Sequence, residues 1–366
     1  MHQTSRSVPD ANDSVLSGVL RAGRGILAVA LLAACANLAG AQTLRFIEPR
    51  PAPPPGDWSG LIGEYGTDSH ILIAERGGTL YATVEWLQPA ALSPEPGDAF
   101  RWPNSGLYDS QSLVFSRSRD GEATKVTIGG AVFPRRQLGP ESGNQLRVKP
   151  VRPIAELRRI ALAAHPPAEP PTARKPDLVE LVRLDPTIKL DIRYATSNDF
   201  LGAPLYTEAR AFMQRPAAEA LVRVSTELHK LGYGLLVHDA YRPWYVTKIF
   251  WDATPPNLKW LVADPASGSK HNRGCAVDLT LYDLKTGQAV EMVSTYDEST
   301  DRAYSQYPGG TSLQRWNRLL LRVAMESQGF EPLPSEWWHF DYKDWRDYPI
   351  TNITFDKIGT TTPNTH

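Results

Sequence analysis

The pattern of apolar positions differs between the two halves of the chain. From residue 57 to 150 the apolar residues form short runs. Two of these runs flank Gly77-Gly78, and two others flank Asp120-Gly121. Short apolar runs on either side of such turns are typical of β-hairpins. We therefore expect residues 57–150 to form a small all-β domain.

After residue 177, helical and strand patterns are mixed. Residues 216–231 space their apolar side chains three or four apart after a proline, and residues 311–328 begin with a capping-box pattern, so both are predicted helices. Residues 275–282 predict a strand, and residues 178–194 alternate enough for strands. Because strands and helices do not alternate regularly, we expect 177–355 to be an α+β domain with a mainly antiparallel sheet and flanking helices.

Proline-rich stretches separate these parts. Residues 42–56 contain five prolines and are expected to be an extended tether. A second proline-rich stretch lies within residues 151–176, which we expect to link the two domains. Residues 356–366 complete the chain as a tail.

The N-terminus has the pattern of an export leader. Arg21 and Arg24 precede an apolar run at 25–34, which is shorter than the ~20 residues that a membrane-spanning helix needs. Small residues follow this run, as in secretory leaders. Residues 1–41 are therefore predicted to direct the protein to the periplasm or the cell envelope.

Two modes of processing fit this leader. An A-x-A-like site ending at Ala41 would leave Gln42 at the new N-terminus. Residues 32–35 instead resemble a bacterial lipobox, which would leave Cys35 lipidated and the protein anchored to a membrane. The sequence leaves both open.

Charge and cysteine content argue against three features. The formal net charge is -1 and no basic block stands out, so we expect no nucleic-acid partner. The chain has two cysteines, Cys35 in the leader and Cys275. This number excludes a disulfide framework and a cysteine-based zinc site.

Two short segments carry candidate chemistry. His271 and Asp278 are seven residues apart, and Asp278 lies in the apolar stretch 276–281, where a carboxylate is costly unless it is paired or bound to a metal. Glu336 and His339 are three apart, beside two tryptophans. Two histidines and an aspartate with an open fourth position are typical of a catalytic zinc site, with Glu336 as its base. Each spacing alone would also fit a surface glutamate or a core histidine.

Taken together, the two segments resemble a known family. The D-alanyl-D-alanine dipeptidases of the vancomycin-resistance type share the pattern S-x-H-x-x-G-x-A-x-D, followed farther along by E-x-W-H. These positions are filled here by Ser269, His271, Gly274, Ala276, Asp278, Glu336, Trp338 and His339. The similarity covers about residues 177–350 and includes the segment 239–243. The dipeptidases belong to a zinc peptidase family that also includes D,D-carboxypeptidases and the hedgehog signalling fold.

This resemblance implies a zinc centre and two catalytic residues. One Zn²⁺ per chain would be held by His271, Asp278 and His339, with Glu336 as the base that activates zinc-bound water. Arg242 corresponds to the family arginine that stabilises the oxyanion, a role that suits a fixed guanidinium in a dry cleft. The alternative for Arg242 is an ion pair that anchors a loop.

Three further residues match family positions that contact the substrate. Asp297 corresponds to an aspartate that binds the free amino group of the dipeptide, and Ser269 and Tyr194 to residues that line the pocket. From the residues alone, the alternative for Asp297 is a solvated loop acid, while Tyr194 could equally be a core aromatic and Ser269 a turn residue.

The activity implied by the resemblance is hydrolysis of D-Ala-D-Ala or similar small D-dipeptides into free D-alanine, linked to peptidoglycan turnover. Two alternatives stay open: a D,D- or L,D-carboxypeptidase that trims peptidoglycan stem peptides, and a non-catalytic module that binds zinc or the cell wall. The β-domain resembles the lipocalin-like domains of some exported hydrolases. The sequence leaves the protein partners unknown.

Overall fold

The computed structural model describes residues 47–85, 87–139 and 146–359. The predicted leader, with Cys35 and Ala41, lies outside these residues, as do the first residues of the tether and the end of the tail. Among the helices that are described, none combines the length and the apolar composition needed to cross a membrane.

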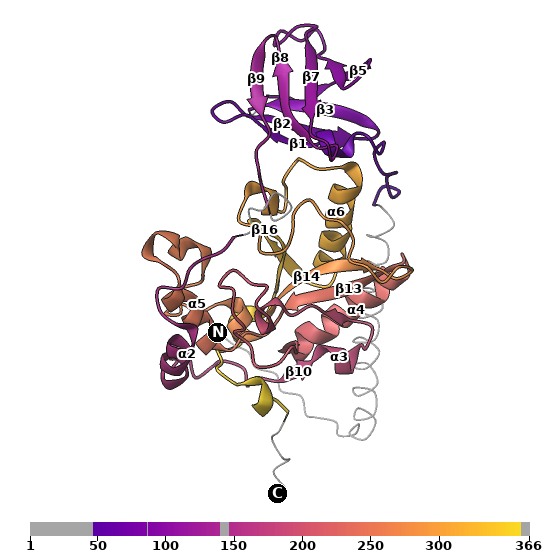
Figure 1. Cartoon of the computed structure of the whole chain (residues 1–366). Helices are drawn as coiled ribbons and strands as arrows, with labels where there is room; N and C mark the ends of the chain where they lie inside the picture. Colours follow the sequence, from indigo (N-terminus) through magenta and orange to yellow (C-terminus); the bar gives the residue numbers. More distant parts are fainter. Residues whose placement is uncertain (1–46, 86, 140–145, 360–366) are drawn as a thin grey trace, which may run out of the picture. The chain divides into compact units, whose positions relative to one another are not determined.

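The first described part of the chain is built from two antiparallel sheets (Figure 1). One sheet has the order β1 (Gly63–Tyr65), β2 (Ile71–Arg76), β3 (Thr79–Val84) and β4 (Ala90–Ala91). The other has the order β5 (Ser93–Glu95), β6 (Ala99–Arg101), β7 (Ser112–Arg117), β8 (Ala123–Ile128) and β9 (Ala131–Pro134). Both sheets contribute to one apolar core, which includes Tyr65, Phe100 and Phe115. The prediction of an all-β region is confirmed.

The turn predicted at Gly77-Gly78 closes the hairpin between β2 and β3. Arg76 pairs with Thr79 across the hairpin, and the two glycines have φ angles of 56° and 80°. A two-residue turn with positive φ at both positions matches the twist of the strands, and glycine adopts it without a steric cost.

The part after residue 177 is organised around a five-stranded sheet. Its order is β11 (Lys189–Leu190), β13 (Tyr233–Asp239), β14 (Ala276–Asp283), β16 (Glu336–Tyr342) and β15 (Phe330–Leu333). Strands β11 and β13 are parallel, and the other neighbours are antiparallel. A separate antiparallel pair consists of β10 (Leu178–Glu180) and β12 (Phe212–Gln214). The predicted α+β fold with a mainly antiparallel sheet is confirmed.

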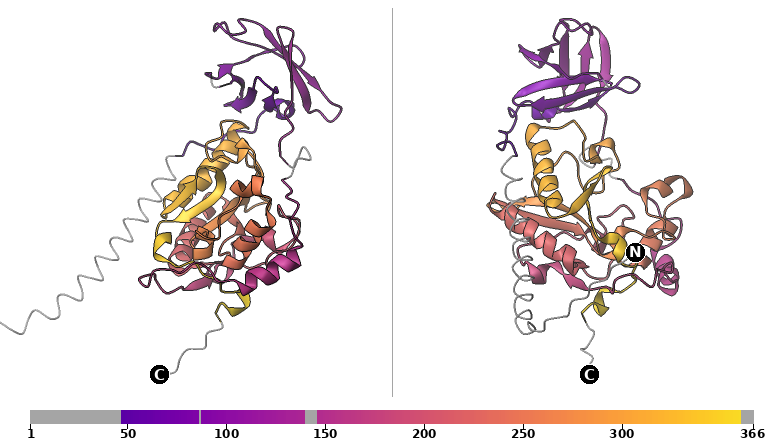
Figure 2. Two further views of the ribbon diagram at one scale, coloured as in Figure 1. Left: turned by 90° about the vertical axis from the view of Figure 1, so that its left-hand side faces the viewer. Right: turned by 180° about the vertical axis from the view of Figure 1, so that it is seen from behind.

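Two long helices flank the sheet (Figure 2). α4 (Arg215–His229) packs against β13, α6 (Ser312–Glu326) packs against β14, β15 and β16, and the two helices contact each other. The predicted capping box forms at the start of α6, because Thr311 and Gln314 each accept a hydrogen bond from the backbone N–H of the other. Both helices lie within two residues of their predicted bounds.

Two segments differ from the simplest expectation. Within residues 178–194, the short helix α3 (Leu181–Leu184) separates the strands β10 and β11, so the expectation of strands was wrong there. A few alternating residues cannot be distinguished by pattern from one helical turn. The stretch 151–176 contains the helix α2 (Ile154–Ala163), which packs against α5 (Trp244–Ala253).

Candidate active site

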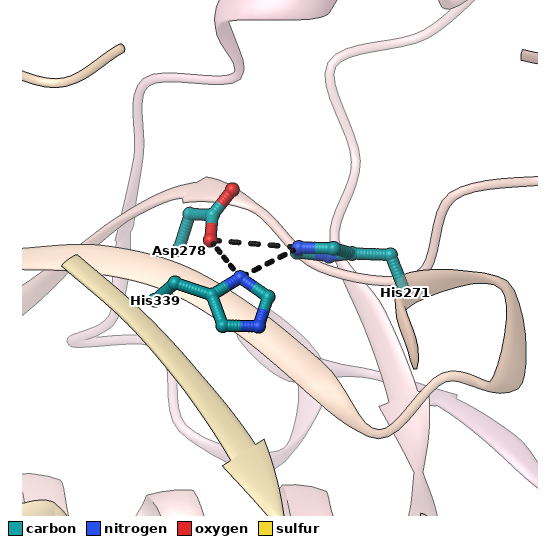
Figure 3. A group of neighbouring side chains, drawn as sticks. All are labelled: His271, Asp278 and His339. Atoms are coloured by element: carbon teal, nitrogen blue, oxygen red, sulfur yellow. Dashed lines mark hydrogen bonds and ion pairs between the residues drawn. The ribbon is translucent and has the colours of Figure 1, made fainter. Parts of the chain in front are cut away.

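The three predicted metal ligands meet at one point (Figure 3). His271 lies in the 3-10 helix η5 (Lys270–Arg273), Asp278 in β14 and His339 in β16. The antiparallel register pairs Asp278 directly with His339, so their side chains emerge side by side. The Nε2 atom of His271 lies 3.2 Å from Nδ1 of His339 and 3.5 Å from Oδ1 of Asp278, and the last two atoms are 2.9 Å apart.

These three atoms fit one tetrahedral metal ion. Ligand atoms about 2.0–2.2 Å from Zn²⁺ lie about 3.3–3.6 Å from one another in a tetrahedron. The observed separations of 2.9–3.5 Å are close to these values, and all three side chains are more than nine-tenths buried. One aspartate and two histidines that converge in this way can hold a single ion.

Hydrogen bonds on the far side of each imidazole fix which nitrogen faces the site. Nδ1 of His271 lies 2.7 Å from the carbonyl oxygen of Ala240, to which it donates. Nε2 of His339 lies 3.0 Å from Oδ1 of Asp341, to which it donates in turn. In each ring the outward nitrogen is thus occupied by a protein acceptor, and the nitrogen that faces the other ligands is the one that can coordinate a metal once it has lost its proton.

The charges around this point favour a cation. Burial would raise the pKa of Asp278, but charge attraction and hydrogen bonds from His271 and His339 hold it well below its usual range. Burial would lower the pKa of His339, yet its bonds to Asp278 and Asp341 raise that pKa to about 10. Positive charge is therefore stabilised where the three ligand atoms meet.

Glu336 stands beside the metal ligands at the start of β16. One of its carboxylate oxygens lies 3.9 Å from Nδ1 of His339, and its side chain is 40% exposed. Partial burial, together with the charge of Asp278, raises the pKa of Glu336. A carboxylate with a raised pKa at this distance can accept a proton and return it.

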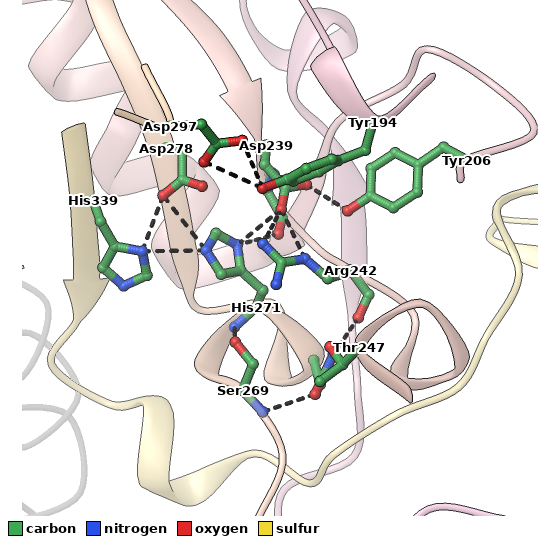
Figure 4. A network of polar contacts seen from close by, with 12 residues as sticks. Tyr194, Tyr206, Asp239, Arg242, Thr247, Ser269, His271, Asp278, Asp297 and His339 are labelled. Atoms are coloured by element: carbon green, nitrogen blue, oxygen red, sulfur yellow. Dashed lines mark hydrogen bonds and ion pairs between the residues drawn. The ribbon is translucent and has the colours of Figure 1, made fainter. Parts of the chain in front are cut away.

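Arg242 is a buried cation whose orientation is fixed by one carboxylate (Figure 4). Its Nε and Nη2 atoms donate to Oδ2 of Asp239 at 3.0 and 2.7 Å. The rings of Tyr194 and Phe250 lie 5.2 and 4.7 Å from the guanidinium carbon. The same oxygen of Asp239 lies 3.6 Å from Nδ1 of His271, so the guanidinium is held next to the metal ligands.

Asp297 approaches the site from the segment after β14 (Figure 4). The hydroxyl of Tyr194 donates to its two carboxylate oxygens, at 3.1 and 3.4 Å. Burial and the negative charges of Asp278 and Glu336 raise the pKa of Asp297 to about 8. Its φ of 60° lies in the left-handed region, which aspartate tolerates at a cost. A positively charged partner would stabilise this carboxylate.

The side chain of Ser269 caps the short helix that carries the metal ligand His271. It is the N-cap of η5, where its Oγ accepts a hydrogen bond of 3.2 Å from the N–H of His271. The structure thus brings all eight predicted site residues into one region, and seven of them, all except Glu336, make the polar contacts drawn in Figure 4.

Known proteins are similar in sequence to the part of the chain that contains this site, residues 174–358. The model of the M15 peptidase family, described as D-ala-D-ala dipeptidase, matches residues 174–358, about half of the chain. The chain belongs to this family. All of the residues that build the metal site and its surroundings lie inside the matched part.

Individual M15 relatives cover the same half. A D-alanyl-D-alanine dipeptidase of Escherichia coli (strain K12) is 33% identical over 174 residues, 48% of this chain and 89% of the relative. Two enterococcal proteins of the same name, from Enterococcus faecalis and Enterococcus faecium, are each 36% identical, over 46% of this chain and 92% and 91% of their own lengths. A solved structure titled "Crystal structure of SurE" aligns with 24% of this chain and with 21% of its own chain, at 22% identity. Its TM-score of 0.20 is too low to indicate a shared fold.

Sequence reasoning missed two carboxylates that accept hydrogen bonds from residues of this M15 site, Asp239 and Asp341. Asp239 accepts hydrogen bonds from both Arg242 and Tyr206, and Asp341 accepts from His339. A signal for Asp239 was available, since it is a carboxylate that ends the apolar run of β13, much as Asp278 interrupts that of β14. The signal for Asp341 was its place two residues after a metal ligand, on the same face of a strand.

Proposed function

We propose that this chain is a metal-dependent D-alanyl-D-alanine dipeptidase. Membership of the M15 family and the names of the relatives support this activity. The observation that carries it is the buried group of His271, Asp278 and His339, three ligand atoms that converge on one point.

We propose Zn²⁺ as the ion, one per chain, because one carboxylate and two imidazoles form the ligand set of a catalytic zinc site with an open position. When bound, Zn²⁺ polarises the substrate carbonyl as a Lewis acid and lowers the pKa of water at the open position. The chain's contribution is to hold the three ligand atoms within 3.5 Å of one another before the ion arrives.

In this proposal Glu336 moves the proton. It accepts a proton from the attacking water and donates it to the leaving nitrogen of the peptide bond. Its raised pKa supports this role, because a carboxylate whose pKa lies closer to neutrality is better able to donate the proton back. Its position 3.9 Å from a metal ligand places it within reach of the reacting groups.

Arg242 would stabilise the negative charge that develops on the carbonyl oxygen. Asp239 engages its Nε and Nη2, which fixes the guanidinium before substrate binds. A donor that needs no reorientation during the reaction contributes more to rate than a mobile one.

Asp297 would select the dipeptide by its free amino group. Its carboxylate is crowded by Asp278 and Glu336, and an ammonium group would relieve that repulsion. Tyr194, which donates to Asp297, would hold the carboxylate in place. A longer peptide has no charged nitrogen at this position, so the pocket would favour substrates of two residues.

We also propose that the protein acts outside the cytoplasm, in the periplasm or the cell envelope, on D-dipeptides released from peptidoglycan. The leader pattern of residues 1–41 supports export, and the motif ending at Cys35 would add a lipid anchor. Two antiparallel sheets around one core are compatible with a lipocalin-like appended domain over residues 57–150.

Turnover of three substrates tests the proposal. The purified protein, loaded with Zn²⁺, should release D-alanine from D-Ala-D-Ala and leave a tripeptide and a pentapeptide stem, both ending in D-Ala-D-Ala, intact. Cleavage of the pentapeptide would instead support a carboxypeptidase. A protein that binds zinc and cleaves none of the three would be a binding module.

Metal analysis provides the control. His339→Ala should lose both the bound zinc and the turnover. Full zinc content in both His271→Ala and His339→Ala would contradict the ligand assignment.

A further inference from the structure

The far side of His339 carries a charged pair that the proposed reaction does not use. Alternation along β16 places His339 and Asp341 on the same face of the strand. Oδ1 of Asp341 lies 3.0 Å from Nε2 of His339, on the side of the ring opposite the metal ligands. Asp341 is only 4% exposed, so this carboxylate meets little water.

The second oxygen of Asp341 is held by Lys270. The Nζ atom of Lys270 donates to Oδ2 of Asp341 at 2.5 Å, and it also lies 5.1 Å from the centre of the Trp345 ring. A buried carboxylate without a cationic partner would be costly, and Lys270 removes much of that cost. Lys270 directly precedes the ligand His271 in η5. This short helix therefore supplies one metal ligand and also the cation that binds Asp341, the residue that accepts a hydrogen bond from the ligand His339.

The two histidine ligands are therefore supported differently. His271 donates to a neutral backbone carbonyl, that of Ala240, whereas His339 donates to a carboxylate. A charged acceptor makes the stronger hydrogen bond, and it increases the electron density on the nitrogen that faces the metal. The support of His339 should thus affect metal affinity through the imidazole itself.

We propose that Asp341 and Lys270 are positioning residues for the metal centre. Asp341 fixes the tautomer and the angle of the His339 ring, and Lys270 fixes Asp341. The pair thereby sets how tightly the ion is held. This inference rests on the proposed metal site. It adds two residues that do not bind the ion themselves but hold one of its three ligands in place.

Metal affinity of Asp341→Asn is the main test. The amide keeps the shape of the side chain and removes its charge. Competition with a chromophoric chelator should show that this variant binds Zn²⁺ about 10–100-fold more weakly than the parent protein. Asp344→Asn is the matched control, because Asp344 lies in the same segment and pairs with Arg174 and not with a metal ligand. Its affinity should equal that of the parent.

A double-variant cycle separates a specific role of Lys270 from a general loss of charge. Lys270→Met keeps most of the side chain against Trp345 and should lower zinc affinity several-fold only while Asp341 is present. In the Asp341→Asn background it should cause no further loss. Visible spectra of the Co²⁺-loaded proteins should shift in Asp341→Asn and stay unchanged in Asp344→Asn, because the bands report the ligand field at the ion.

Three outcomes would overturn the inference: parental zinc affinity in Asp341→Asn, an equal loss in Asp344→Asn, or losses from Lys270→Met and Asp341→Asn that simply add. If Asp341→Asn does not fold, Lys270→Met alone decides, and unchanged affinity in that variant refutes the role of the pair. A parent protein that binds no zinc at all would contradict the proposed function and not merely this inference.

Discussion

Removing the charge of Asp239 should destabilise the protein far more than removing a similar charge at the surface. Asp239 is fully buried, and its carboxylate accepts hydrogen bonds from Nε and Nη2 of Arg242, from the hydroxyl of Tyr206 and from the N–H of Ala240. Asp239→Asn would leave the buried guanidinium of Arg242 without its counter-ion.

The expected loss follows from these contacts. Two hydrogen bonds between charged groups contribute about 1.5–3 kcal/mol each, or roughly 3–6 kcal/mol together. Breaking a buried ion pair by removing one partner costs about 3–5 kcal/mol. The two estimates agree, so we expect the free energy of unfolding of Asp239→Asn to fall by about 3–5 kcal/mol.

Urea unfolding of metal-free protein at neutral pH measures this loss without a contribution from metal binding. Asp177→Asn is the control, because the pair of Asp177 with Arg215 is about half exposed and should contribute less than about 1 kcal/mol. The double variant Asp239→Asn/Arg242→Met should recover part of the loss, since it also removes the unpaired charge. If Asp239→Asn costs no more than Asp177→Asn, burial does not determine the strength of this pair and the reasoning is wrong.

Three further predictions concern the site and its surroundings. Glu336→Ala should retain zinc and lose about 10²–10⁴-fold in kcat, as measured by metal analysis and steady-state kinetics; loss of the zinc would identify Glu336 as a ligand. Asp297→Ala should lower kcat/KM for D-Ala-D-Ala and have much less effect on the N-acetylated dipeptide; an equal effect on both would mean that Asp297 does not read the amino group. The pKa of Asp191 is lowered to about 2 by its hydrogen bond to His238, which outweighs the effect of burial. Because that pKa is lowered, the stability it contributes is present above the unfolded pKa of about 3.9 and is lost as pH falls toward 2. Asp191→Asn should therefore lose less stability than the parent between pH 5 and pH 3 in denaturant titrations, and identical pH dependence would contradict this.

The hydrophobic pattern was sufficient for the regular elements. The Gly77-Gly78 hairpin and the helices α4 and α6 form where apolar spacing and turn chemistry placed them, because these features depend on neighbouring residues alone. The pattern was insufficient at residues 178–194, where one helical turn separates two short strands. The division of the chain into a leader, tether, linker and two domains stays a prediction.

The chemistry of the metal centre was also available from the sequence. His271, Asp278 and His339 were identified from the types and spacing of residues in two motifs and from their resemblance to a family, and they converge in the structure. Residue type determines which atoms can bind a metal, and that information does not depend on the fold.

Which groups from distant parts of the chain hold those atoms in place was decided only by the tertiary structure. Lys270 and Asp341 are 71 residues apart, and Tyr206 and Asp239 are 33 apart, yet each pair shares a hydrogen bond. Such contacts arise from the register of β14 with β16 and from the paths of the loops that lead into them, which no local pattern encodes. The sequence by itself determined what reaction the site can perform, whereas the packing of distant segments decided how its charged groups are held, because burial and partnership exist only once the chain has folded.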